Sequence, residues 1–321
     1  MPRSEKYKDP ESAGTTTYVF GPVPSRRLGL SLGVDLIPPK TCSYDCLYCQ
    51  VGKTTCLTVE PRTFAPLASV MKELKQNLER ITPDVVTFSG SGEPTLHSGI
   101  GEAVASVKAL SDLRVAVLTN GSLLWREEVR QRLLAADVIM PTLSTADEDT
   151  FRKIHRPHPD LLLSRVIQGV QSLRKIYRGE LDVEVVLLAG FNDGPQQLAG
   201  LRKVLKDINP DRIQLNTVVR PPADARALSL DRERMEEVKT YFGEKAEIIA
   251  SIPPKHRDMN LHSLTLALME MVKRRPVRAL DAAQALAIQN EEAERLLKGL
   301  VVKGRLHSQV HLGETYYTSG K

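Results

Sequence analysis

The sequence predicts an α/β protein, namely a partial parallel TIM-type (β/α)6-7 barrel followed by a small C-terminal winged helix-turn-helix domain. Short β-branched runs alternate with amphipathic stretches between about residues 33 and 250. Most of these runs are continuously apolar, which is typical of parallel strands that are covered on both faces. The pattern changes at "IPPKHRDMN" (252–260), where two prolines and several polar residues indicate a linker.

The predicted strands of the barrel occur in a regular order along the chain. They are residues 33–37, 84–89, 114–119, 137–144, 183–188, 212–219 and 246–251. Residues 67–81 and 162–177 are the clearest helices between them, because apolar residues recur there at steps of three and four. Repeated strand-helix units favour a barrel. A doubly wound open sheet is the alternative, but no G-x-G-x-x-G segment follows the first strand.

The chain divides into four predicted regions. They are a flexible N-terminal extension (1–17), the barrel (18–252), a linker (253–262) and a winged-helix-like domain (263–321). In the last region we predict three helices, "SLTLALMEMVKRR", "LDAAQALAIQ" and "NEEAERLLKGLVVKG", and then two short strands around Leu312 and Gly313. This order of elements is typical of a winged helix-turn-helix module.

The composition of the 321 residues is that of an ordinary globular protein, with 41% hydrophobic and 26% charged residues. No apolar run approaches the roughly 18 residues that a membrane span needs. The polar N-terminus lacks the apolar core of a signal peptide, and four cysteines, three of them clustered, do not suit a disulfide framework. We therefore expect a cytoplasmic protein. Its net charge of +5 permits an anionic partner but does not require one.

Polar segments follow the predicted strands at their C-terminal ends. In order along the chain they are "TCSYDCLYCQ" (41–50), "SGSGEPTL" (89–96), "TNGS" (119–122), "STADEDTF" (144–151), "AGFNDG" (189–194) and "RPPAD" (220–224). The C-terminal ends of parallel barrel strands share one rim, and active sites of such barrels are built there. The sequence therefore predicts one site made from all six loops.

The first loop holds Cys42, Cys46 and Cys49 in a C-x3-C-x2-C spacing. Thiolates ligate iron or zinc. Three of them would leave one iron of a four-iron cluster open to another ligand. A structural zinc site that also uses Cys56 is the alternative, although zinc ligands more often come as two pairs separated by a longer loop.

This spacing, with Tyr48 before the last cysteine, resembles the signature of the radical S-adenosylmethionine (SAM) superfamily. The segment "GSGEP" resembles the superfamily's Gly-Gly-Glu segment, with Ser91 in place of the first glycine of the pair. "TNG" and "STAD" fall where its third-strand and fourth-strand segments fall. "GPVPSRRLG" (21–29), "IHRPHPDL" (154–161) and "LNTVVRPP" (215–222) resemble the branch grouped with the wyosine tRNA-modifying synthases.

The resemblance implies that the three cysteines ligate a [4Fe–4S] cluster and that SAM occupies its open iron. It implies SAM-binding roles for Tyr48, Gly90, Ser91, Gly92, Glu93, Asn120, Ser144 and Asn192. The reaction would release methionine and a 5′-deoxyadenosyl radical, which would abstract hydrogen from a substrate. A one-electron donor of flavodoxin or ferredoxin type would be a partner.

The substrate is left open among a tRNA base, a peptide or protein residue and a small molecule. Archaeal wyosine synthases carry a second cluster on further N-terminal cysteines, and no cysteine precedes Cys42 here.

Arg220, stiffened by Pro221 and Pro222, is predicted to act in catalysis by clamping an anion at the barrel mouth. His155 and His158 either act in catalysis or fix a loop. Arg26 and Arg27 are expected to be solvated charges, with contact to the substrate or SAM as the alternative.

An iron–sulfur regulator that binds DNA through the winged helix is the non-catalytic alternative. Its presumed recognition helix begins with Glu291, Glu292 and Glu294, which would meet phosphate with like charge. We therefore expect this domain to dock a protein or present a substrate, with RNA contact as the second choice.

Overall fold

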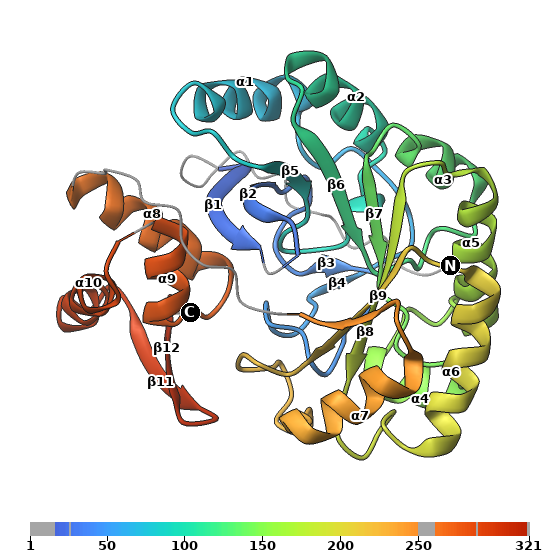
Figure 1. Ribbon diagram of the computed structural model, residues 1–321. Coiled ribbons are helices and arrows are strands. Elements are labelled where there is room, and N and C mark those ends of the chain that lie inside the picture. The colour runs from blue at the N-terminus through green and yellow to red at the C-terminus, as the bar shows by residue number, and fades with distance from the viewer. Residues whose placement is uncertain (1–16, 26, 250–260, 287, 320–321) are drawn as a thin grey trace, which may run out of the picture.

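The computed structural model describes residues 17–25, 27–249, 261–286 and 288–319. Its main body is a curved, mostly parallel sheet with helices along its outer side, open between its first and last strands (Figure 1). The eight strands follow the order β1-β2-β5-β6-β7-β8-β9-β10. They are β1 (Val19–Ser25), β2 (Gly29–Val34), β5 (Val85–Phe88), β6 (Arg114–Thr119), β7 (Val138–Pro141), β8 (Glu180–Leu187), β9 (Arg212–Thr217) and β10 (Ala246–Ile248). The predicted α/β class with a parallel sheet is confirmed.

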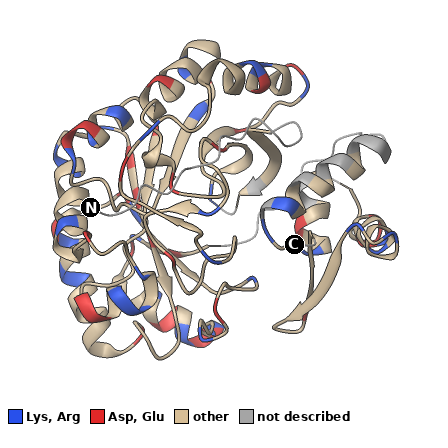
Figure 2. Ribbon diagram, turned by 180° about the vertical axis from the view of Figure 1, so that it is seen from behind, with Lys and Arg blue, Asp and Glu red and all other residues tan. Residues whose placement is uncertain are grey.

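The helices of this body connect the parallel strands and cover the sheet. They are α1 (Leu67–Leu78), η1 (Pro94–Leu96), α2 (Ile100–Leu110), α3 (Glu127–Leu133), α4 (Glu148–His155), α5 (Leu163–Ile176), α6 (Pro195–Ile208) and α7 (Arg232–Phe242). Each buries a narrow apolar stripe, such as Val70 and Leu74 of α1, while charged residues lie along the outer faces (Figure 2). Three of them begin at acidic caps, because the carboxylates of Glu93, Asp147 and Asp231 accept backbone N–H bonds from the first turns of η1, α4 and α7.

The first edge of the sheet differs from the prediction. The strand expected at 33–37 lies earlier, at β2, and it pairs with β1, an antiparallel strand that the sequence did not suggest. β1 contains Pro22 and Pro24, which are unusual in a strand because proline cannot donate to the ladder. Edge strands tolerate proline, and β1 is the edge. The prolines that concealed the strand therefore fit its position.

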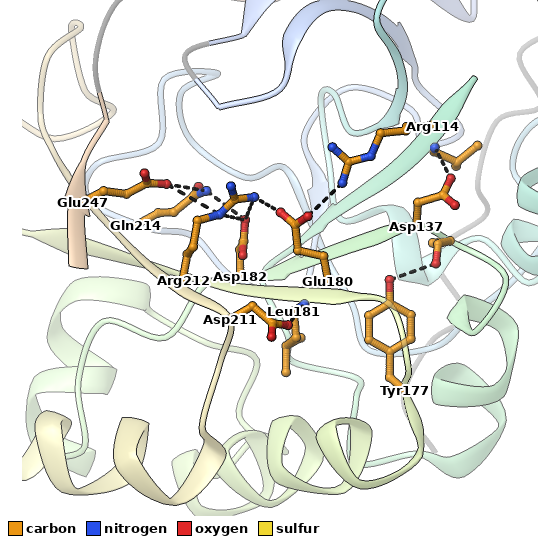
Figure 3. A network of polar contacts seen from close by, with 12 residues as sticks. Arg114, Asp137, Tyr177, Glu180, Leu181, Asp182, Asp211, Arg212, Gln214 and Glu247 are labelled. Carbon is orange, nitrogen blue, oxygen red and sulfur yellow. Dashed lines mark hydrogen bonds and ion pairs between the residues drawn. The ribbon is translucent and has the colours of Figure 1, made fainter. Parts of the chain in front are cut away.

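The amino-terminal end of the barrel is closed by a network of charged groups (Figure 3). The guanidinium of Arg212 contacts the carboxylates of Asp182, at 2.9 Å, and Glu180. Glu180 also pairs with Arg114 at 2.9 Å, and the amide of Gln214 donates to Asp182 at 3.0 Å. Asp182 is fully buried, and burial raises its pKa to about 7.

The C-terminal region forms a second module with its own core. Its elements are α8 (Leu261–Arg274), α9 (Ala279–Leu286), α10 (Asn290–Val302), β11 (His307–His311) and β12 (Glu314–Thr318). This is the predicted order of three helices and a ribbon. The predicted N-terminal extension lies, apart from residue 17, outside the described residues, as do Arg26 and most of the predicted linker, and α8 begins two residues before the expected start at 263. The winged-helix assignment stays a prediction.

The module packs on the open side of the barrel (Figure 1). Val23 and Phe20 of β1 join the core formed by α8, α9 and α10. At the other side of the opening, the hydroxyl of Tyr316 donates to the backbone carbonyl of Val219, which follows β9. The module thus covers β1 and reaches the loop after β9. None of the helices described here is long and apolar enough to cross a bilayer.

Candidate functional site

The cysteine loop lies at the C-terminal rim, between the second and fourth loops of the barrel. Its start and end pair in a short parallel ribbon of β3 (Thr41–Cys42) and β4 (Cys56–Leu57). The backbone N–H of Leu47 donates to the carbonyl of Ile154 at the end of α4, at 2.9 Å. Tyr44 packs edge-on against Phe151 of the same helix, with ring centroids 5.5 Å apart. These contacts fix the loop on both sides.

The thiols of this loop are close enough to influence one another electrostatically. Burial and then the charge of Glu93 raise the pKa of Cys42 to about 12, and the Cys49 charge contributes to the rise. Burial and the charges of Cys42 and Cys49 raise the pKa of Cys46 well above its usual value. The ionisation of Cys42 and Cys46 is thus disfavoured, and a bound cation would stabilise their thiolates. With Cys49 they form a donor set of three partly buried thiols. The set fits an iron–sulfur cluster with three protein ligands.

Among the described residues, no three His, Cys, Asp or Glu side chains are grouped as ligands of a single metal ion.

The "GSGEP" loop packs directly on the segment before Cys42. The N–H of Ser91 donates to the Asp35 carboxylate at 2.9 Å, and the carbonyl of Ser91 accepts from the N–H of Lys40 at 2.9 Å. Gly90 has a φ of +149°, and a Cβ there would lie 2.3 Å from the Asp35 side chain. A Cβ on Gly92 would lie 2.0 Å from the carbonyl oxygen of Thr41. Both glycines are needed for this close approach.

Glu93 orients the loop after β6. Its Oε1 accepts hydrogen bonds from the hydroxyls of Thr95 and Thr119, both at 2.6 Å, and from the Thr95 N–H. Its Oε2 accepts the N–H of Asn120 at 2.7 Å, and the side-chain amide of Asn120 donates to Ser43 at 2.8 Å and lies 3.5 Å from the sulfur of Cys42. Burial raises the pKa of Glu93, against these hydrogen bonds. Predicted residues from three loops are thus brought together.

Ser144 and Asn192 lie together on the other side of the rim, and both are buried. The hydroxyl of Ser144 accepts the N–H of Val186 at 3.0 Å. The amide of Asn192 donates to the carbonyls of Ser144 and Val186, each at 2.8 Å, and its oxygen accepts the N–H of Leu188. Both side chains therefore hold the fourth and fifth loops together, and their contacts to SAM stay predictions.

Both histidines of the "IHRPHP" segment contact the cysteine loop, His155 through its ring and His158 through its backbone. The Nδ1 of His155 lies 3.4 Å from the sulfur of Cys46 and 3.2 Å from the hydroxyl of Tyr48. Burial lowers the pKa of His155 to about 3, so the ring is neutral at physiological pH. His158 instead fixes the loop, because its N–H donates to the carbonyl of Ser43 at 2.9 Å.

Two arginines have partners that the sequence did not reveal. Arg27, expected in solvent, forms an ion pair of 2.7 Å with Glu184, which faces the barrel interior and is also bonded by Asn216. Arg220 is buried, donates to Gln50 of the cysteine loop at 3.4 Å and pairs with Asp281 of α9 at 3.3 Å. Arg220 is thus paired with a carboxylate of the module, and its role as an anion clamp stays a prediction.

Glu184 could have been found from the sequence, whereas Asp281 could not. Glu184 is the charged residue at an inward position of an otherwise apolar stretch, "VEVVL", whose Val183 and Val185 face the helices. Asp281 lies 61 residues from Arg220 in a helix whose docking position no local pattern specifies.

The comparisons with known proteins agree with this geometry. Residues 36–201, more than half of the chain, match the radical SAM superfamily domain. A UPF0026 protein of Methanocaldococcus jannaschii is 39% identical over 71% of this chain and 72% of its own length. A UPF0026 protein of Helicobacter pylori J99 is 33% identical over 82% of this chain and 86% of its own length. A protein of Brachyspira hyodysenteriae named GTPase Obg is 35% identical over 94% of this chain, which spans only 45% of that relative.

Solved structures show the same fold at low identity. Streptococcus suis SuiB bound to precursor peptide SuiA superposes with a TM-score of 0.52 and 14% identity, over 75% of this chain and 51% of that one. A radical SAM methyltransferase from Sphaerobacter thermophilus superposes with a TM-score of 0.50 and 18% identity, over 68% of this chain and 65% of that one. From the domain match, the UPF0026 relatives and the cysteine loop at the rim, the chain belongs to the radical SAM superfamily and is a radical SAM enzyme.

Proposed function

We propose that Cys42, Cys46 and Cys49 hold a [4Fe–4S] cluster and that SAM binds at its fourth iron. The observation that carries this proposal is the cluster of three mutually interacting thiols at the rim of a parallel sheet. When bound, the cluster supplies one electron that cleaves SAM, so that a 5′-deoxyadenosyl radical can take hydrogen from a substrate. All four cysteines are free thiols, which suits a reducing compartment such as the cytoplasm.

The loops on one side of the rim are proposed to bind the methionyl end of SAM. The backbone of Gly90, Ser91 and Gly92 faces the cysteine loop. Its carbonyls would accept hydrogen bonds from the methionyl ammonium, and its N–H groups would donate hydrogen bonds to the methionyl carboxylate. Glu93 would attract the methionyl ammonium with its negative charge. It would accept a hydrogen bond through Oε2, because Oε1 already accepts three hydrogen bonds. Asn120 holds the thiol of Cys42 in place through its side-chain amide.

The opposite side is proposed to bind the adenosine. Tyr48 would lie along the adenine, with its hydroxyl held by His155. Ser144 and Asn192 would contact the ribose mainly through the loop backbone that their side chains fix, because both donors of the Asn192 amide are already used. The apolar residues beneath, including Leu47, Val186 and Leu188, would keep water away from a radical.

The substrate and the partners are proposed more broadly. The resemblance to wyosine synthases favours a tRNA base, SuiB is described with a precursor peptide, and GTP 3′,8-cyclase of Microcystis aeruginosa, 28% identical over half of this chain, is named for a nucleotide. A flavodoxin or ferredoxin is the proposed electron donor. We propose the α8–β12 module as a winged helix that presents the substrate, since Tyr316 and Asp281 fasten it to the barrel.

The test is anaerobic reconstitution with iron and sulfide, followed by dithionite and SAM and chromatography for 5′-deoxyadenosine. The wild type should form this product, and Cys42→Ala should lose iron and product together. Cys56→Ala is the matched control, and it should keep both. Absence of product above Cys42→Ala would refute the proposal, and equal iron loss in Cys56→Ala would favour a four-cysteine metal site.

A further inference from the structure

A cleft of about 740 Å³ lies between the cysteine loop and the C-terminal module. One wall carries Cys49 and Gln50, and Pro221 lies on the segment after β9. The facing wall carries Lys273 of α8 and Gln309 of β11. Its volume falls in the range of roughly 300–1,000 Å³ that is common for small-molecule sites. The cleft therefore reaches from the module to the proposed cluster, and a molecule of moderate size could bridge the two.

The charged groups that line this cleft have one sign. Lys53 and Lys40, whose ammonium nitrogen is buried, come from the cysteine-loop wall, and Lys273 and Arg275 come from the module. No Asp or Glu occurs among the described residues of its lining. Figure 2 shows Lys and Arg on the side of the module that faces the barrel. A cleft lined by charges of one sign concentrates the field and attracts the opposite charge.

The charge behind the module wall does not cancel this field. Asp281 faces Arg220 at 3.3 Å and Arg278 at 2.9 Å, and the charge of Arg275 also acts on it. Although burial alone would raise it, the hydrogen bonds from Arg278 and the charges of the arginines hold the pKa of Asp281 at about 2. The carboxylate of Asp281 is thus paired with Arg220 and Arg278 within the chain, and it does not line the cleft.

Arg275 also lines a cavity of about 100 Å³ inside the barrel, together with Arg27 and Arg220. The small cavity thus adjoins the cleft through Arg275, while its own cations Arg27 and Arg220 are paired with Glu184 and Asp281. Ammonium groups on one wall and a guanidinium on the other suit an anion with several acceptor oxygens and more than one charge, which describes phosphate better than a single carboxylate.

We propose that this cleft binds the phosphate group of the substrate, with the rest of the molecule extending toward Cys49. The reaction of the bound substrate rests on the proposed radical SAM function, whereas the binding of phosphate in the cleft does not. A nucleotide or another phosphorylated small molecule fits the volume, and the backbone of a polynucleotide is the other source of the same phosphate chemistry.

The test is calorimetric titration of the full-length, anaerobically reconstituted protein in the presence of saturating SAM. The probes are inorganic pyrophosphate, a nucleoside triphosphate and a short single-stranded RNA. The double variant Lys53→Gln/Lys273→Gln should bind pyrophosphate about a hundredfold more weakly, or about tenfold per lost charge-assisted contact. Lys303→Gln, an exposed site of the same module outside the cleft, should bind like the wild type.

The outcomes separate this inference from the proposed function. Wild-type protein that forms 5′-deoxyadenosine yet does not bind pyrophosphate would overturn the cleft alone, as would equal weakening by Lys303→Gln. Protein that binds pyrophosphate in the cleft but never cleaves SAM would overturn the proposed function alone. If the wild type binds the nucleoside triphosphate and the double variant does not, the phosphate of the substrate belongs to a nucleotide. If pyrophosphate displaces bound RNA, the phosphate belongs to a polynucleotide. RNA binding that pyrophosphate does not displace contradicts the cleft.

Discussion

The two ends of the barrel both bury ionisable groups, but they satisfy them differently. At the amino-terminal end, Asp182 and Glu180 meet the guanidinium of Arg212, so acidic and basic groups of the chain satisfy each other (Figure 3). At the carboxyl-terminal end, Cys42, Cys46 and Glu93 are acidic groups buried close together. Burial and the neighbouring negative charges raise the pKa values of Cys42 and Cys46. The first arrangement pairs opposite charges within the chain, and burial still raises the pKa of Asp182 to about 7. The second gains most from a cation that the chain does not supply, which is typical of a binding site.

The largest expected effect tests the stability of the amino-terminal end. Arg212→Met leaves Asp182 buried without its main cationic partner and should cost about 3 kcal/mol at pH 8, near the lower limit for buried pairs because Arg212 is partly exposed. Urea unfolding at pH 8 and pH 5 measures this. The loss should be smaller at pH 5, where Asp182 can be protonated. An equal loss at both pH values would contradict the assignment.

The pH dependence of the wild type follows from the same carboxyl. Because its pKa is about 7 in the folded chain and near 4 in the unfolded chain, the stability linked to Asp182 is full below pH 4 and is lost as the pH rises through 7. Asp182→Asn should flatten the stability profile between pH 5 and pH 8. A profile identical to that of the wild type would show that Arg212 keeps Asp182 ionised throughout.

At the carboxyl-terminal end, Glu93→Gln should act on SAM more than on the fold. The substitution removes one charge and turns one acceptor into a donor facing the N–H of Asn120. SAM affinity should fall about tenfold, as expected for one charge-assisted contact, while the iron content stays. Equilibrium dialysis with labelled SAM measures the affinity. Glu60→Gln, an exposed surface change, is the matched control, and an equal effect there would refute the role of Glu93.

The contact between barrel and module should affect the stability less than the amino-terminal network does. Asp281→Asn weakens the pairs with Arg220 and Arg278 and should cost about 1–2 kcal/mol at neutral pH. Since the pKa of Asp281 is lowered to about 2, its contribution is present above pH 4 and lost as the pH falls through 2, opposite in sign to Asp182. Thermal unfolding of the variant at pH 7 tests this, with Lys298→Ala on α10 as a nearly neutral control.

The sequence predicts the parts of the molecule that depend on local patterns. The apolar runs located the parallel strands from β5 to β10, and the spacing of Cys42, Cys46 and Cys49 identified the rim loop that the domain match covers. β1 was missed because prolines obscure an edge strand. The partners of Arg27 and Arg220 could not be predicted, because each pair joins residues brought together only by tertiary packing.

The position of the module has a consequence for the solubility of the barrel. β1 is an edge strand, and it directs Val23 and Phe20 into the core of the module rather than into its own. Without α8 and α9, Val23 and Phe20 would be exposed to solvent, where a second copy could cover them through apolar contacts. The module therefore protects the barrel from self-association, whatever else it binds, and a barrel produced alone should aggregate.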